Sequence, residues 1–278
     1  MFKDRKIVVA TKHKKEYVLG PILEKELGVF CIVSEKIDTD KLGTFSGEIE
    51  RYDDPITTAR NKCLMAIEET GCDLAIASEG TFGMHPEIFF LPANDELLFF
   101  LDKKNNLEII VRELSTETNY CTHDIYSKED LLVFAEKAGF PSHGLILKKE
   151  KKDFSEMTKG IVDKEQLISS FEKLFNKHGV AHVETDMRAM YNPTRMKVIE
   201  KAAHKLINKI NSRCPDCKTP GFGITSAKQG LPCELCNTPT RSTISYVYAC
   251  QKCPFVKEEL FPHGKMKEEA TYCDVCNP

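Results

Sequence analysis

The stretch TTARNKCLMAIEETGCDLAIASEG, residues 57–80, decides the fold. Asp54 and Pro55 precede it as an N-cap and a first-turn residue, and Gly71 can end the resulting helix. The apolar run at residues 73–78 then predicts a short strand that ends at Glu79 and Gly80. A helix followed at once by an apolar strand predicts an α/β domain with an acidic side chain at a strand end.

The same alternation of elements extends on both sides of this stretch. Strands are predicted at residues 6–10, 30–34, 96–101, 107–114, 144–148 and 181–184. Helices are predicted at residues 13–27, 127–138, 166–178 and 192–210. The lysine-rich residues 149–159 are interpreted as a solvated loop, with an anion-binding flap as the second interpretation. Residues 1–211 are therefore expected to form one α/β domain with a mixed sheet, flanking helices and a central cleft.

Composition excludes several classes of protein. The chain has 278 residues, 41% of them hydrophobic and 29% charged, which is ordinary for a globular protein. A net charge of −3 gives no overall polycation for nucleic acid. No apolar run has the length that a membrane helix needs, and the first residues have too short a run for a signal peptide. These features predict a cytoplasmic protein.

The cysteines identify a second domain. Eight of the twelve form four CxxC pairs: Cys214/Cys217, Cys233/Cys236, Cys250/Cys253 and Cys273/Cys276. Without a secretory signal, this spacing favours thiolate–metal sites over disulfides. Redox-active dithiols are the alternative, but the segment lacks a thioredoxin-like βαβ context. Zinc binds four thiolates tetrahedrally, so four CxxC knuckles predict two structural Zn²⁺ ions in a zinc-ribbon-like domain at residues 212–278.

The pairing of the knuckles stays open at this point. The intervening gaps of 15, 13 and 19 residues all suit four-cysteine sites. A sequential scheme pairs neighbours, and a nested scheme joins CELC to CQKC and CPDC to CDVC. The segment RSTISYVYAC, residues 241–250, predicts a strand that enters the third knuckle.

The charge of this second domain bears on its partners. Residues 211–278 carry eight Lys and Arg against seven Asp and Glu, which gives weak electrostatic attraction to phosphate backbones. A protein-contact or dimerisation module is therefore at least as good an interpretation as an RNA-binding one.

A candidate cleft collects the remaining charged motifs. TKHKKE, residues 11–16, follows a predicted strand and opens a helix, so its amides and lysines could receive a phosphate. Glu79 ends a predicted strand, where α/β folds open their clefts, and Gly80 permits close backbone approach. Arg195 lies in a first helical turn, where a cation gains little unless an anion joins it. For Arg188 and Arg195 the alternative is a surface pair with Glu184 or Asp186.

Three segments together resemble a known family group. ATKHKKE, TTARNKCLMAIEETGCDLAIASEG and NPTRMKVIEKAAHKL are similar, in that order, to motifs of the pyrophosphatases that remove noncanonical purine nucleoside triphosphates, such as those of inosine and xanthosine. His13 replaces the usual Asn of the first motif. The four-CxxC tail, with TDMRA and NPTRM, is also similar to an uncharacterised bacterial family.

The resemblance implies an activity and roles for individual residues. It implies hydrolysis of a nucleoside triphosphate or related phosphorylated nucleotide, with Glu79 as catalytic residue. Glu79 and, by a weaker inference, Glu48 are expected to hold Mg²⁺ or Mn²⁺. The residues expected to contact the substrate are Thr11, His13, Lys14, Lys15, Lys62, Gly80, Arg188 and Arg195. A specific hypothesis is that Glu79 and Arg195 face one cavity; the rival function is nucleotide or RNA binding without catalysis.

Overall fold

The computed structural model describes residues 1–34, 36–37, 43 and 52–278. The chain divides into two compact units, Met1–Ile207 and Asn208–Pro278. The division falls inside the last long helix, four residues before the boundary expected from the sequence. Glu48, the second expected metal ligand, lies outside the described residues.

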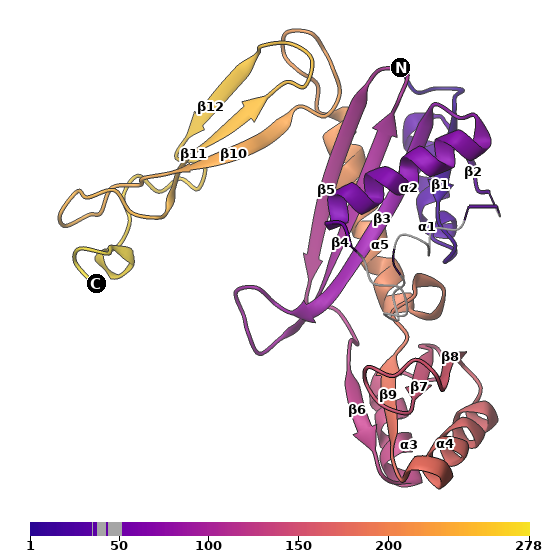
Figure 1. Ribbon diagram of the computed structural model, residues 1–278. Helices are drawn as coiled ribbons and strands as arrows, with labels where there is room; N and C mark the ends of the chain where they lie inside the picture. Colours follow the sequence, from indigo (N-terminus) through magenta and orange to yellow (C-terminus); the bar gives the residue numbers. More distant parts are fainter. Residues whose placement is uncertain (35, 38–42, 44–51) are drawn as a thin grey trace. The chain divides into compact units, whose positions relative to one another are not determined.

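A five-stranded mixed sheet forms the first part of unit 1 (Figure 1). Its order is β2-β1-β3-β4-β5, and the strands are β1 (Lys6–Ala10), β2 (Phe30–Ile32), β3 (Leu74–Met84), β4 (Pro92–Asp102) and β5 (Leu107–Ser115). β1 pairs in parallel with β2 and β3, whereas β3, β4 and β5 pair antiparallel. The expected mixed sheet is therefore confirmed.

Local chemistry sets the ends of the first two helices. α1 (Glu16–Leu27) ends at Gly28, whose φ of 66° suits a residue without a Cβ. α2 (Pro55–Thr70) begins at Asp54, whose carboxylate accepts hydrogen bonds from the amides of Ile56 and Thr57. The apolar side of α2 packs on one face of the sheet, against alternate residues of β3 and β4 such as Ala77 and Phe99.

The strand that holds Glu79 is longer than expected, which corrects the prediction that it ends there. β3 continues to Met84 because β4 pairs with it along its whole length, from Leu74↔Asp102 to Met84↔Pro92. β1, in contrast, ends at Ala10, opposite Ala77. Glu79 therefore lies just past the end of the neighbouring parallel strand, and not at the end of its own.

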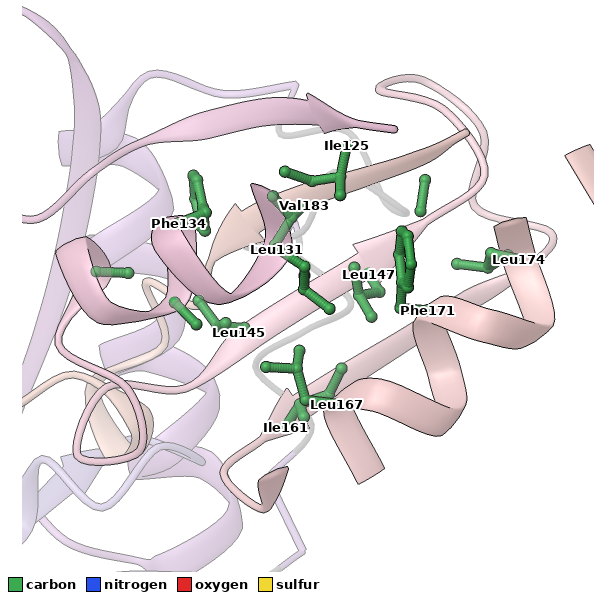
Figure 2. Packing of buried hydrophobic residues seen from close by; sticks show 13 residues of the cluster. Ile125, Leu131, Phe134, Leu145, Leu147, Ile161, Leu167, Phe171, Leu174 and Val183 are labelled. Atoms are coloured by element: carbon green, nitrogen blue, oxygen red, sulfur yellow. The ribbon is translucent and has the colours of Figure 1, made fainter. Parts of the chain in front are cut away.

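A second sheet completes unit 1. Its order is β6-β9-β7-β8, and the strands are β6 (Thr122–Ile125), β7 (Leu145–Lys148), β8 (Met157–Ile161) and β9 (Ala181–Thr185). Figure 2 shows the core on one face, where α3 (Lys128–Ala138) and α4 (Lys164–His178) bring Leu131, Phe134, Leu167 and Phe171 against Leu145, Leu147 and Val183. β6 and β8 were not expected, since short strands with mixed polarity give no clear alternation.

The last helix links the second sheet back to the first. It follows a 3₁₀ turn, η2 (Ala189–Tyr191), and runs from Pro193 to Asn211 as α5. Asn192 precedes it, and its Oδ1 accepts from the Arg195 amide at 2.9 Å, as its sequence position predicted. α5 contacts the first sheet through Arg195–Glu96 and Lys205–Glu113, on the face opposite α2.

Unit 2 is built on a small antiparallel sheet. The order is β10-β11-β12, from β10 (Gly223–Gln229), β11 (Thr243–Ala249) and β12 (Val256–Leu260), and a 3₁₀ turn, η3 (Ala270–Tyr272), follows. β11 confirms the strand expected before the third knuckle, whereas β10 and β12 were not expected. The fold is thus mixed α/β with a cysteine-rich C-terminal module. None of the helices in the described part of the chain combines the length and apolar character that a membrane crossing requires.

Candidate functional site

Two groups of four cysteines in unit 2 have the geometry of metal sites. Site 1 is Cys214, Cys217, Cys250 and Cys253, and site 2 is Cys233, Cys236, Cys273 and Cys276, with the ligand atoms of each group within 4.8 Å of one another. Four Sγ···Sγ distances within these two groups are 3.5 to 3.9 Å. A tetrahedral ion with metal–sulfur bonds of about 2.3 Å places its sulfurs about 3.8 Å apart, whereas a disulfide needs about 2.05 Å. Each group could therefore hold one metal ion.

The pairing of the knuckles is interleaved, so both the sequential and the nested scheme were wrong. Knuckle 1 joins knuckle 3, and knuckle 2 joins knuckle 4. The antiparallel register explains this, because Gly223, soon after knuckle 1, pairs with Ala249, which directly precedes knuckle 3. At the other end of the sheet, the bridge Cys233↔Glu268 brings the chain before knuckle 4 to knuckle 2. Cysteine spacing alone does not encode this register.

Knuckles 1 and 2 are copies of one local structure, with the shared pattern C-x-x-C-x-T-P. Lys218 and Asn237 take a left-handed φ of 61° and 60° after the second cysteine of each. In each, the first cysteine amide donates to the threonine carbonyl at 2.9 Å. A hydrogen bond from Thr219 lowers the pKa of Cys217 to about 6, and Thr238 does the same for Cys236. This favours the thiolate, which is the form that binds metal.

The interleaved pairing predicts the metal content of paired variants. Cys217→Ser/Cys250→Ser removes two ligands of site 1, so we expect the loss of about one metal equivalent per chain. Cys217→Ser/Cys236→Ser damages both sites and should lose about two. Elemental analysis of the reduced, freshly purified full chain measures the difference. A sequential pairing would reverse the two losses, and a nested pairing would give a loss of about two equivalents in both variants. Either result would overturn the interleaved assignment.

In unit 1, the loop after β1 folds back on β3. Lys15 is buried, and its Nζ donates to Ser78 Oγ at 2.6 Å and to the Ser78 carbonyl at 3.1 Å. Burial, with a further contribution from Arg195, lowers the pKa of Lys15 to about 7, although Glu96 and Glu79 oppose the shift. The segments TKHKKE (residues 11–16) and ASEG (residues 77–80) are therefore in contact, as expected for a shared cleft.

Several cations surround this loop. Burial lowers the pKa of His13 to about 3, and the charges of Lys15, Arg195, Arg188 and Lys62 lower it further. His13 is therefore neutral at physiological pH. Its amide donates to Thr11 Oγ1 at 3.0 Å, and Lys14, exposed, takes a left-handed φ of 59°. Four of the expected substrate-binding cations thus contribute to the potential at one residue of the loop.

Glu79 and Arg195 lie on opposite faces of the sheet, which corrects the hypothesis that they share a cavity. Glu79 points to α2, where its Oε1 lies 2.5 Å from Lys62 Nζ. The next residue, Gly80, faces the other way because side chains alternate along a strand. A Cβ at Gly80 would lie 2.4 Å from Arg195 Nη2, so Gly80 makes room for the arginine and not for a phosphate.

Arg195 is held in a buried ion pair. It is 1% exposed, and its Nε and Nη2 donate to the two carboxylate oxygens of Glu96 at 3.0 and 3.1 Å. Nη1 donates to the Met187 carbonyl at 2.7 Å. The anion that joins this arginine is therefore the Glu96 carboxylate, and the alternative of a surface pair with Glu184 or Asp186 was wrong for Arg195. Arg195 joins α5 to the first sheet and to the segment after β9.

Arg188 pairs with Asp186, one of the two acidic partners considered from the sequence. Nε and Nη2 donate to Asp186 at 3.0 and 2.6 Å, and the guanidinium lies 4.6 Å from the Tyr191 ring centroid. Asp186 is fully buried and also accepts from the Gly160 amide. This network fixes Arg188 at the rim of a cavity.

The cavity, of about 260 Å³, lies over the face of the second sheet that α3 and α4 leave open. Its lining includes Tyr120, Phe154, Lys148, Glu184 and Arg188. Sequence reasoning did not find it, because residues 149–159 were interpreted as a loop. The signal in the sequence was the lysine-rich run directly after a predicted strand, which was interpreted first as a solvated loop and second as an anion-binding flap.

The chain belongs to a family defined by a domain of unknown function, DUF6671, whose model matches residues 62–278. Comparison with curated proteins finds no match. Among solved structures, the chain is similar to protein VC0702 from Vibrio cholerae, with 9% sequence identity and a TM-score of 0.35. That match covers 74% of this chain and 94% of the other.

Proposed function

We propose that unit 1 binds a phosphorylated nucleotide and hydrolyses a nucleoside triphosphate with the help of a divalent metal ion. The observation that carries this proposal is that the charges of Lys15, Lys62, Arg188 and Arg195 all lower the pKa of His13, so four cations lie within electrostatic range of the loop. A triphosphate carries several negative charges and is attracted to cations. The resemblance of residues 5–210 to noncanonical nucleotide pyrophosphatases supplies the substrate class.

In this proposal the triphosphate lies along the loop at residues 11–15. The loop enters α1, where the amides of Tyr17 and Val18 already donate to the carbonyls of Lys14 and Lys15, so the side chains of the loop would make the contacts with the anion. Lys14 is exposed and would contact the phosphates directly. Lys15, with a pKa of about 7, gains a stronger positive charge when an anion binds beside it.

The nucleoside end of the ligand would occupy the neighbouring cavity. Arg188 lines this cavity, and its charge also lowers the pKa of His13, so the cavity and the loop at His13 lie within electrostatic range of one residue. Tyr120 and Phe154 offer aromatic surfaces to a base. The volume of about 260 Å³ lies just below the range of about 300–1,000 Å³ that is typical of small-molecule sites.

The metal ions have different roles in this proposal. Mg²⁺ or Mn²⁺ would be held by Glu79 and the phosphates, and would neutralise charge and polarise a phosphoryl oxygen. Lys62 Nζ already contacts Glu79 Oε1, so a metal ion at this carboxylate would compete with Lys62. A bound triphosphate would give the displaced lysine another anionic partner. Zn²⁺ in sites 1 and 2 would be structural, because four thiolates leave no open position.

The cysteines also bear on the cellular compartment of the protein. Eight cysteines that act as metal ligands suit a reducing compartment, so we propose a cytoplasmic location. Unit 2 would contact a protein partner or RNA. We infer no membrane partner.

A screen of nucleoside triphosphates with Mg²⁺ or Mn²⁺, read as pyrophosphate release, tests the hydrolase. We expect turnover of at least one purine nucleoside triphosphate. Glu79→Gln should lower turnover roughly a hundredfold, equivalent to about 2.7 kcal/mol, and leave binding nearly unchanged. Glu87→Gln, at an exposed position in the β3–β4 loop, is the matched control and should behave as wild type. No release from any triphosphate would refute the hydrolase.

The second candidate function is nucleotide or RNA binding without catalysis. It is favoured by the Lys62–Glu79 ion pair, because within the described ranges Glu79 is the one expected metal carboxylate and a lysine already neutralises it. The same screen separates the two functions when binding is measured alongside it. Tight binding without pyrophosphate release supports the second function.

A further inference from the structure

The cavity beside Arg188 contains a carboxylate that its neighbours hold in place. Glu184 Oε1 lies 2.8 Å from Lys148 Nζ and 3.3 Å from His182 Nε2. Burial opposes ionisation of Glu184, but hydrogen bonds from His182 and Lys148 outweigh it and lower the pKa of the carboxyl group. Glu184 is therefore an ionised acceptor that faces the cavity.

The supporting residues are themselves fixed. Lys148 is 2% exposed, and its Nζ lies 4.9 Å from the Phe154 ring centroid. It also donates to the Lys151 carbonyl at 3.4 Å, which ties the loop after β7 to the sheet. His182 is held from its other side by Asp124, at 2.6 Å from Nδ1. The carboxylate thus has a defined position before any ligand arrives.

Glu184 lines the cavity, and its printed contacts with Lys148 and His182 hold the carboxylate through Oε1. An ionised carboxylate accepts hydrogen bonds and donates none. A ligand edge that faces this carboxylate must therefore carry an N–H group, and a carbonyl oxygen there would be repelled. The cations at the rim, such as Arg188 and Lys152, suit a carbonyl oxygen elsewhere on the same ring.

We propose that this cavity selects a purine that carries an exocyclic amino group beside a ring carbonyl, as guanine does, and that Glu184 is the residue that reads the amino group. The inference rests on the proposed nucleotide site and deepens it. Guanine carries a 2-amino donor and a 6-carbonyl acceptor. Hypoxanthine lacks the amino group, and xanthine presents a carbonyl in its place. The selection thus runs against the deaminated purines that the sequence resemblance suggests.

The test compares the binding of GTP, ITP and XTP to the full chain by calorimetry, in the absence of divalent metal so that no turnover occurs. GTP and ITP differ in the 2-amino group alone. We expect GTP to bind roughly tenfold to a hundredfold more tightly than ITP, because the amino group donates to a charged acceptor. XTP should bind most weakly. Equal affinities for GTP and ITP would overturn the inference.

Two variants assign the effect to Glu184. Glu184→Gln should reduce the preference for GTP over ITP to about threefold or less, since the charge that strengthens the bond is gone. Glu156→Gln is the control, because Glu156 pairs with Lys177 and does not line this cavity. An unchanged preference in Glu184→Gln would show that another group reads the base.

Tripolyphosphate serves as the third probe and separates this inference from the proposed function. It should bind wild type and both variants equally, which shows that the phosphate site is intact. If tripolyphosphate and all three nucleotides fail to bind, the proposed function itself is wrong, and the base assignment with it. If they bind wild type without a preference for GTP, the base assignment alone is wrong.

Discussion

Chelation of the bound metal is expected to unfold residues 208–278 while residues 1–207 stay folded. Unit 2 has a three-stranded sheet whose strands are largely exposed, and its buried residues include the ligands Cys214, Cys233 and Cys273. So small a core supplies little folding free energy, whereas structural zinc contributes about 10–16 kcal/mol in zinc-finger peptides. Unit 1 has large apolar clusters of its own, on its first and on its second sheet.

Hydrogen exchange on the full chain, with and without a chelator, measures this effect. Amide protection should disappear in β10, β11 and β12 and persist in β3 and β4. Readdition of Zn²⁺ should restore it. Persistent protection of β11 after complete metal removal would show that unit 2 folds without metal. Loss of protection in β3 would show that the two units do not fold independently.

Arg195→Ala is expected to lower the free energy of unfolding of unit 1 by about 3–5 kcal/mol. The substitution leaves Glu96, which is 0% exposed, as a buried charge without its bidentate partner. Burial already opposes the ionisation of Glu96, and Arg195 is the main reason that its pKa stays below the ordinary value. The urea midpoint of the transition that unfolds β3 and β4 measures the loss.

Two controls test the reason for that loss. Arg112→Ala removes an arginine from an exposed pair with Asp95 on the same sheet, and should cost about 1 kcal/mol or less. Arg195→Met/Glu96→Leu removes both charges and should recover much of the stability that Arg195→Ala loses. If the double variant is no more stable than Arg195→Ala, the arginine stabilises the fold by packing and not by charge.

Local features of the fold could be predicted because short-range chemistry fixes them. Asp54 and Gly71 delimit α2, and Asn192 begins α5, as the capping preferences of these residues predict. The four CxxC knuckles likewise identified the eight cysteines that form the two groups able to hold a metal ion. In each case the information lies within a few residues of sequence.

Long-range features could not be predicted in the same way. The end of β3 depends on its pairing with β4, and the pairing of the knuckles depends on the register of β10 and β11. Glu96 lies 99 residues from Arg195 in sequence. Its one local signal was a charge at the start of the apolar run ELLFFL, which marks a buried residue in need of a partner.

The interleaved metal sites also impose an order on events during synthesis of the chain. A ribosome releases Cys214 and Cys217 first, then Cys233 and Cys236, and neither pair has its partner at that moment. Once Cys250 and Cys253 have been synthesised, site 1 is complete, whereas knuckle 2 still lacks Cys273 and Cys276. During that interval knuckles 1 and 2 can each supply two thiolates to a metal ion bound by knuckle 3. The pairing of β10 with β11 brings knuckle 1, and not knuckle 2, to knuckle 3, so we expect sheet formation and the loading of site 1 to occur together.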